Sequence, residues 1–225
     1  MLLLSLLSTL ACAADTHMGR SLAPTMHHLG APWLERNTRQ NEEDPAALID
    51  GLELAEGMVA CDIGAGSGYH ALRMSRRVGD SGTVYAIDIQ PEMLALVQAG
   101  AERSGMTNVE TVQNSQTQTG LPPESCDVIL LVDVYHELSE PSAMLESMLQ
   151  ALRVDGALVI VEFRAEDPRV PIKPLHKMSK AQVMKELTAS GYKLVSELNT
   201  LPWQHAMFFQ RADGPDPAIE PAPWP

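Results

Sequence analysis

The sequence predicts an α/β fold with a doubly wound, mostly parallel sheet of seven strands, Rossmann-like in layout. Between residues 44 and 211, short apolar runs alternate with stretches of helical spacing, a pattern typical of βαβ units. The run 128–132 (VILLV) is apolar on both faces, as in the middle of a parallel sheet. A glycine-rich loop follows the first apolar run, where a strand would turn into a helix.

The elements follow in order along the chain. Asp44 and Pro45 predict a helix start, since Asp caps helices and Pro suits the first helical position, and this helix runs to about residue 52. A turn at Asp155-Gly156 is expected to close the helix over 141–152. The short link through Pro202 predicts a hairpin in which the last strand is antiparallel. Strands are expected at 58–63, 83–87, 109–112, 128–132, 157–161, 192–198 and 206–210, and helices at 69–78, 91–104, 141–152 and 180–190.

Three further segments flank the domain expected over 44–211. Residues 1–14 (MLLLSLLSTLACAA) are apolar and end in small residues, as secretory signals do, and Cys12 also resembles a lipoprotein cleavage site. This predicts an exported protein, periplasmic or lipid-anchored, with a cytoplasmic protein as the alternative. Residues 15–43 form a polar extension that suits a lid over the site. Residues 212–225 contain five prolines and predict a disordered tail.

Composition excludes several classes of partner. A formal net charge of −13 argues against binding nucleic acid or anionic lipid. No internal apolar stretch is long enough to span a membrane. The expected partner is a small molecule, and no oligomeric state follows from the sequence. Cys61 and Cys126 lie in apolar runs and are expected as small core hydrophobes rather than as part of a disulfide scaffold.

The loop 62–69 (DIGAGSGY) is the strongest functional signal. Glycines between a strand and a helix let the backbone approach a ligand closely. Asp88 ends the next strand, where an acid can accept hydrogen bonds from ribose hydroxyls. The spacing is GxGxG rather than the GxGxxG of dinucleotide sites, and no P-loop motif is present. A nicotinamide or other adenosyl-cofactor enzyme, or a non-catalytic binding module on the same fold, remain alternatives.

Four segments together resemble the class I S-adenosylmethionine-dependent methyltransferases over roughly residues 45–210. They are DIGAGSG, VYAIDIQPEM, LPPESCDVILLVDVYHEL and LRVDGALVIVEF. The segments GAPWLER, DVYHEL, EFRAEDPRVPIKPLHKMS and LPWQH narrow this to a methyltransferase-domain group of unassigned substrate. The resemblance implies S-adenosylmethionine as cofactor and methyl transfer to a small-molecule acceptor by direct displacement.

The resemblance also implies the cofactor site. Asp88 would bind the ribose hydroxyls and Ile89 would pack on adenine. Ser115 and Gln116 stand where many relatives carry an acidic residue near the adenine amino group. The implied cofactor-binding residues are Asp62, Gly64, Ala65, Gly66, Gly68, Asp88, Ile89, Ser115, Gln116, Asp133 and Val134.

Catalytic candidates follow the strands at the cofactor edge. His136 comes directly after the fourth strand and suits a base or a contact to the acceptor, while a His that merely caps its loop is the alternative. Tyr135 and His205 are further candidates. His136, His176 and His205 have no i, i+3 or i+4 spacing, so no metal site is expected even though they could converge with Glu137.

Overall fold

The computed structural model describes residues 16–216, and within them seven strands form one sheet of order β5-β4-β3-β6-β7-β9-β8. All neighbours pair in parallel except β9, which runs antiparallel to β7 and to β8. The predicted hairpin and its antiparallel last strand are confirmed. The seven strands are β3 (Val59–Ile63), β4 (Thr83–Asp88), β5 (Val109–Gln113), β6 (Cys126–Val132), β7 (Leu152–Phe163), β8 (Tyr192–Leu198) and β9 (Gln204–Arg211).

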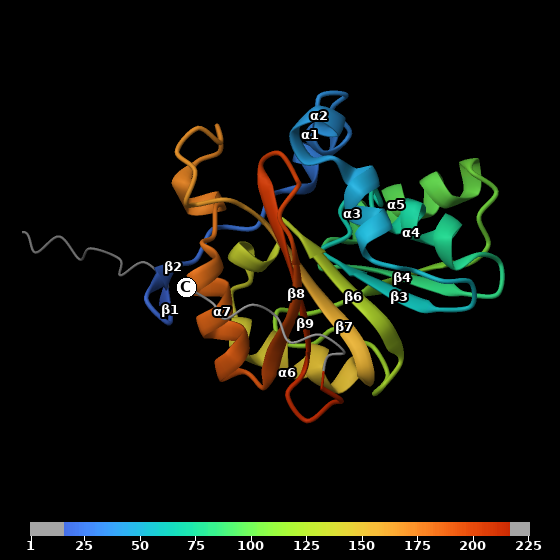
Figure 1. The fold of residues 1–225 in the computed structure, drawn as a ribbon. Helices are drawn as coiled ribbons and strands as arrows, with labels where there is room; N and C mark the ends of the chain where they lie inside the picture. The colour runs from blue at the N-terminus through green and yellow to red at the C-terminus, as the bar shows by residue number, and fades with distance from the viewer. Residues whose placement is uncertain (1–15, 217–225) are drawn as a thin grey trace, which may run out of the picture.

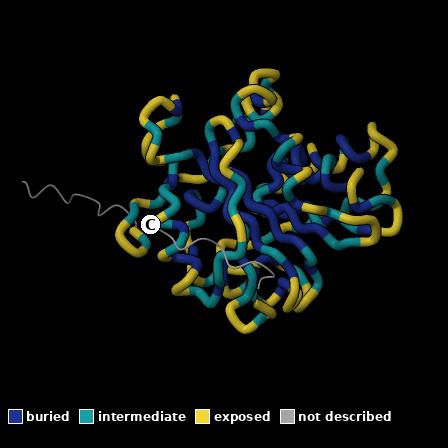
Figure 2. The backbone as a smooth tube through the Cα atoms, in the orientation of Figure 1, coloured by how far each residue is buried: buried dark blue, intermediate teal, exposed yellow. Residues whose placement is uncertain are grey.

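Helices cover both faces of the sheet (Figure 1). One face packs against α3 (Pro45–Gly51), α4 (Ala71–Val78) and α5 (Pro91–Arg103). The other packs against α6 (Pro141–Ala151) and α7 (Lys180–Ala189). The side chains between these layers are mostly aliphatic, with Met74, Met144 and Met148 fully buried. Most residues of the central strands are buried (Figure 2).

The predicted elements match the observed ones to within a few residues, with one correction. Asp155-Gly156 does not form a turn after α6, because β7 already begins at Leu152. The pairing of β6 with β7 shifts between Cys126 and Val128, so a bulge takes the place of the turn.

The polar extension is ordered. It forms the hairpin β1 (Thr16–His17) and β2 (Arg20–Ser21), then η1 (His28–Gly30), α1 (Ala31–Leu34) and α2 (Arg39–Glu43). Two short 3-10 turns, η2 (Tyr135–Glu137) and η3 (Pro174–His176), follow β6 and β7. The predicted leader, with Cys12, and the tail beyond residue 216 lie outside the described residues. Across the described chain, every helix is too short or too polar to cross a membrane.

The two core cysteines are bonded to each other, which corrects the expectation of two independent core hydrophobes. Cys61 of β3 and Cys126 of β6 are fully buried and form a disulfide with their Cα atoms 6.2 Å apart. The sequence places them 65 residues apart with no spacing motif, and only the adjacency of β3 and β6 brings them together. The disulfide links the first strand of the sheet to the fourth in chain order.

This bond should stabilise the fold by restricting the unfolded chain. Because it closes a loop of 65 residues, its loss should lower the free energy of unfolding by about 4 kcal/mol. The measurement is urea unfolding of the wild type and of the Cys61→Ala/Cys126→Ala variant, each with and without dithiothreitol. Reductant should move the wild-type midpoint and leave the variant unchanged. A wild-type midpoint insensitive to full reduction would contradict the prediction.

Candidate active site

A cavity of about 1040 Å³ lies at the carboxyl ends of β3, β4, β6 and β7, where doubly wound sheets bind their ligands. Its walls come from the glycine loop, the loops after β4, β5 and β6, the η3 loop, and residues 22–34, which we call the strap. The strap residues on the cavity wall are Leu22, Ala23, Pro24, Thr25, Met26, Trp33 and Leu34. Of the polar extension predicted as a lid, this part encloses the cavity.

The glycine loop packs so closely on its neighbours that side chains have no room there. Gly64 and Gly66 have φ angles of 72° and 53°, which L-residues rarely adopt. A Cβ on Gly64 would come within 2.5 Å of Val134, and one on Gly66 within 2.6 Å of Leu34. The Gly66 N–H donates to Asp88 Oδ2 at 3.0 Å, and the Gln90 N–H donates to Asp88 Oδ1 at 2.9 Å. The carboxylate of Asp88 thus holds the loop and keeps lone pairs for a ligand.

One end of the cavity suits a flat heterocycle. Ile89 is 36% exposed there, and Asn114, Ser115 and Gln116 form the adjoining wall. Gln90 ties the strap to this end, because its side chain accepts from the His28 N–H at 2.8 Å and donates to the Met26 carbonyl at 2.9 Å. These residues sit where the sequence places adenine and ribose.

Not every residue of the predicted cofactor set lines the cavity. Gly64, Gly66, Asp88, Ile89, Ser115, Gln116, Asp133 and Val134 do. Asp62, Ala65 and Gly68 belong to the same loop but do not line the cavity. Asp133 follows β6 with a φ of 55°, a strained conformation for a non-glycine residue, and its Oδ2 accepts from Gln204 at 2.8 Å. Burial and the carboxylates of Glu43 and Glu162 raise the pKa of Asp133.

Asp62 should make the stability of the protein depend on pH. Burial raises the pKa of Asp62 from 3.8 to about 7, and its Oδ2 has no hydrogen-bond partner among the described residues. The folded state therefore binds more protons than the unfolded state between about pH 4 and 7, so stability falls as pH rises through that window. Asp62→Asn cannot ionise and should remove this loss. The free energy of unfolding of Asp62→Asn should exceed that of the wild type by more at pH 8 than at pH 5, and the difference should be about 2 kcal/mol.

Urea unfolding at the two pH values measures this difference. Asp80→Asn is the control, because Asp80 is exposed on the loop between α4 and β4. An equal gain for Asp62→Asn at pH 5 and pH 8 would exclude Asp62 as the titrating group.

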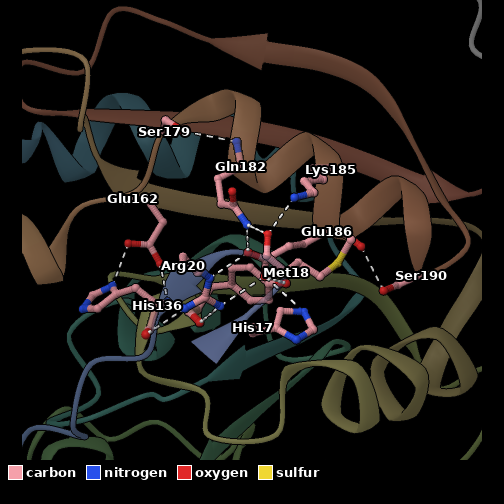
Figure 3. A network of polar contacts seen from close by, with 11 residues as sticks. His17, Met18, Arg20, His136, Glu162, Ser179, Gln182, Lys185, Glu186 and Ser190 are labelled. Carbon is pink, nitrogen blue, oxygen red and sulfur yellow. Dashed lines mark hydrogen bonds and ion pairs between the residues drawn. The ribbon is translucent and has the colours of Figure 1, made fainter. Parts of the chain in front are cut away.

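The same cavity is also lined by a cluster of imidazoles and carboxylates. His136 Nδ1 lies 2.7 Å from Glu162 Oε2, and the His136 N–H of the main chain donates to Glu162 Oε1 at 3.1 Å (Figure 3). His136 Nε2 lies 3.1 Å from His176 Nδ1 on η3. Burial acts to lower the pKa of His136 and Glu162 acts to raise it, with a net value above the ordinary one. Glu137 completes the cluster beside both rings.

Tyr135 and His205 are not brought to the cavity. The phenol of Tyr135 donates to Glu186 Oε2 on α7 at 2.7 Å, so it points away from the site. His205 is fully buried on β9, with Nε2 3.0 Å from the Met178 carbonyl. Both groups pack within the structure, and His136 alone of the three catalytic candidates lines the cavity.

The β1–β2 hairpin anchors one end of the strap to α7 and η2 (Figure 3). Arg20 Nε donates to Glu186 Oε1 at 2.7 Å, and its guanidinium also donates to the carbonyl of His136 at 3.2 Å. The Ala23 N–H donates to that same carbonyl at 3.1 Å. Glu186 is fully buried and accepts from Gln182 and Tyr135 as well. The network fixes the backbone of His136.

Sequence reasoning missed three residues of the site: Arg39, Gln90 and Glu162. Arg39 lines the cavity, is 3% exposed, and pairs with Glu43 at 2.6 Å. The i, i+4 spacing of Arg39 and Glu43 in α2 was a readable signal. Glu162 lies in the apolar second half of β7, where a charged residue is unusual and indicates a polar partner. No sequence pattern marks Gln90 as a site residue, because the hydrogen bonds of its side chain are with the backbone of the strap.

Fold and site together define a protein that binds an adenosyl cofactor at the carboxyl ends of a Rossmann-like sheet. A family described as methyltransferase domain matches residues 54–211. An S-adenosylmethionine-dependent methyltransferase from Aquifex aeolicus is similar in structure, with a TM-score of 0.78, 26% identity, and coverage of 83% of this chain and 100% of that one. The chain belongs to the S-adenosylmethionine-dependent methyltransferase family.

Curated relatives agree on the reaction and differ in the acceptor. A protein-L-isoaspartate O-methyltransferase of Methanococcoides burtonii is 34% identical over 51% of this chain and 54% of its own length. A ubiquinone/menaquinone biosynthesis C-methyltransferase of Enterobacter sp. is 27% identical over 66% of this chain and 58% of its own. The chain thus spans little more than half the length of these relatives.

Proposed function

We propose that this protein transfers a methyl group from S-adenosylmethionine to a small-molecule acceptor. When bound, the cofactor supplies a methyl group already activated on a sulfonium, so the protein mainly aligns the reactants and excludes water. The family match supports the reaction class, and a cavity whose lining includes both the implied cofactor residues and His136 supports a small acceptor.

The observation that carries the proposal is the cradle around Gly64 and Gly66. Because neither glycine carries a Cβ, the loop backbone packs closely against Val134 and Leu34 on the cavity wall. The Gly66 N–H also donates to Asp88, so the loop and this carboxylate line the cavity together, which suits the ribose of the cofactor. Ile89 and the wall 114–116 would receive the adenine, and Asp133 and Val134 the methionyl part. His136 would then face the acceptor at the far end of the same cavity.

Calorimetric titration of the purified chain tests the proposal. S-adenosylhomocysteine and S-adenosylmethionine should each bind at one site per chain, and NAD should not compete. Binding of NAD alone would overturn the proposal in favour of a nicotinamide enzyme, and binding of none of the three in favour of a non-catalytic module.

We further propose that the protein functions in an oxidising compartment. A buried disulfide between adjacent sheet strands supports this, since such bonds persist where thiols are not kept reduced. The apolar residues 1–14 would direct the export. Denaturing lysis of the cells in the presence of an alkylating agent tests the proposal, because both cysteines are buried in the native protein. Cys61 and Cys126 should stay unlabelled unless a reductant is added first, and full labelling of both without reductant would overturn it.

A further inference from the structure

Three ligand-type atoms meet at the acceptor end of the cavity. His136 Nε2 lies 3.1 Å from His176 Nδ1, and Glu137 Oε1 lies 3.7 Å from each of these nitrogens. Atoms at these separations can share one ion at ligand distances of about 2.0–2.2 Å after shifts of a few tenths of an ångström. No other group of His, Cys, Asp and Glu in the described residues gathers in this way.

The atoms behind the cluster are already held in the way metal sites require. Glu162 Oε2 holds His136 Nδ1 at 2.7 Å, which leaves Nε2 directed at the cluster. The Met26 N–H donates to Glu137 Oε2 at 3.0 Å, which leaves Oε1 as the available oxygen. Carboxylates and backbone groups in these positions orient the ligands of known metal sites.

The cluster is also open on one side. All three residues line the same cavity as Gly64 and Asp88. An ion bound to them would therefore keep free coordination positions that face the reactants. Two imidazoles and one carboxylate with open positions suit a divalent transition metal rather than Mg²⁺ or Ca²⁺, which prefer oxygen ligands.

We propose that His136, Glu137 and His176 bind a Zn²⁺ ion that holds the methyl acceptor through an ionised hydroxyl or thiol. The acceptor half of this proposal rests on the proposed methyl transfer, whereas the metal half does not. Zn²⁺ lowers the pKa of a bound oxygen or sulfur acid, so the acceptor loses its proton to solvent as it binds. The new bond joins that oxygen or sulfur to the methyl carbon. The bond from methyl carbon to sulfonium breaks, and its electron pair stays on the cofactor sulfur.

Metal binding is tested on the full chain after dialysis against a chelator. Zn²⁺ titrated calorimetrically should bind at one ion per chain, Co²⁺ should give visible absorption bands, and Mg²⁺ should not compete. His176 is partly exposed. The substitution His176→Ala should weaken Zn²⁺ binding at least 100-fold and leave the affinity for S-adenosylhomocysteine within threefold of the wild type. Glu137→Gln should act in the same direction. His27→Ala is the control, because His27 is exposed and outside the cluster.

Each result has a defined meaning. Zn²⁺ binding that survives both His176→Ala and Glu137→Gln, or no stoichiometric binding at all, would overturn the metal site even if S-adenosylhomocysteine binds normally. Catechol and 2-mercaptoethanol serve as probes of the acceptor half, with the Co²⁺-loaded protein saturated with S-adenosylhomocysteine. At least one should shift the Co²⁺ spectrum, and a spectrum unchanged by both would overturn the acceptor assignment. Failure of the wild-type protein to bind S-adenosylhomocysteine would instead refute the proposed function.

Discussion

Asp88→Ala is expected to weaken S-adenosylhomocysteine binding at least 100-fold, roughly 2.7 kcal/mol. The Asp88 carboxylate accepts from the backbone of Gly66 and of Gln90, so its removal frees both the glycine loop and the segment that binds the strap. Hydrogen bonds to a charged group contribute about 1.5–3 kcal/mol each, and the ribose contacts would be lost as well. Calorimetric titration measures the change directly.

The control for this experiment is Asp80→Ala, which removes a carboxylate from an exposed loop and should leave the affinity unchanged. Far-ultraviolet circular dichroism of both variants establishes that they are folded. Wild-type affinity in a folded Asp88→Ala protein would contradict the assignment of the cofactor site to this end of the cavity.

Arg20→Met is expected to lower the free energy of unfolding by about 3–5 kcal/mol, because it leaves the carboxylate of Glu186 buried without its cation. It should also weaken S-adenosylhomocysteine binding, since the strap loses its anchor beside His136. Urea unfolding and calorimetry measure the two effects. Most of the stability should return in Arg20→Met/Glu186→Gln, where no unpaired charge is left.

Arg153→Met provides the matched comparison. Arg153 pairs with Asp127 at 3.4 Å, but half of its side chain is exposed, so water screens the pair. Its loss should change the free energy of unfolding by less than about 1 kcal/mol. Equal effects of the Arg20 and Arg153 substitutions would mean that the buried network contributes nothing special.

The order of strands and helices was predictable because local signals agree with the fold. Apolar runs such as 128–132 mark buried strands, and Pro91 and Pro141 begin helices where the spacing indicates them. The Asp155-Gly156 turn was predicted wrongly because turn-forming residues also fit a bulge in a paired strand. Pairing with β6 decides between the two, and a single sequence does not reveal it.

The positions of the backbone segments of the site were predicted more accurately than the contacts between its side chains. Gly64, Gly66 and Asp88 are adjacent to regular elements, so their positions follow from the strand pattern. The proximity of His176 to His136 depends on how η3 packs against η2, across 40 residues of sequence. The absence of an i, i+4 spacing therefore said nothing about whether they meet. The Cys61–Cys126 bond was missed for the same reason.

The contact between Arg20 and Glu186 has a consequence for biosynthesis. The two residues are 166 positions apart, so at about 5–20 residues per second the ribosome adds Glu186 roughly 10–30 s after Arg20. Throughout that interval the strap lacks its partner on α7, and β3, the glycine loop and β4 are all synthesised before that partner. A prematurely terminated chain that ends before α7 would contain the glycine loop and Asp88 yet lack this anchor for the wall of its cavity. The binding site is therefore completed only after α7 has been translated.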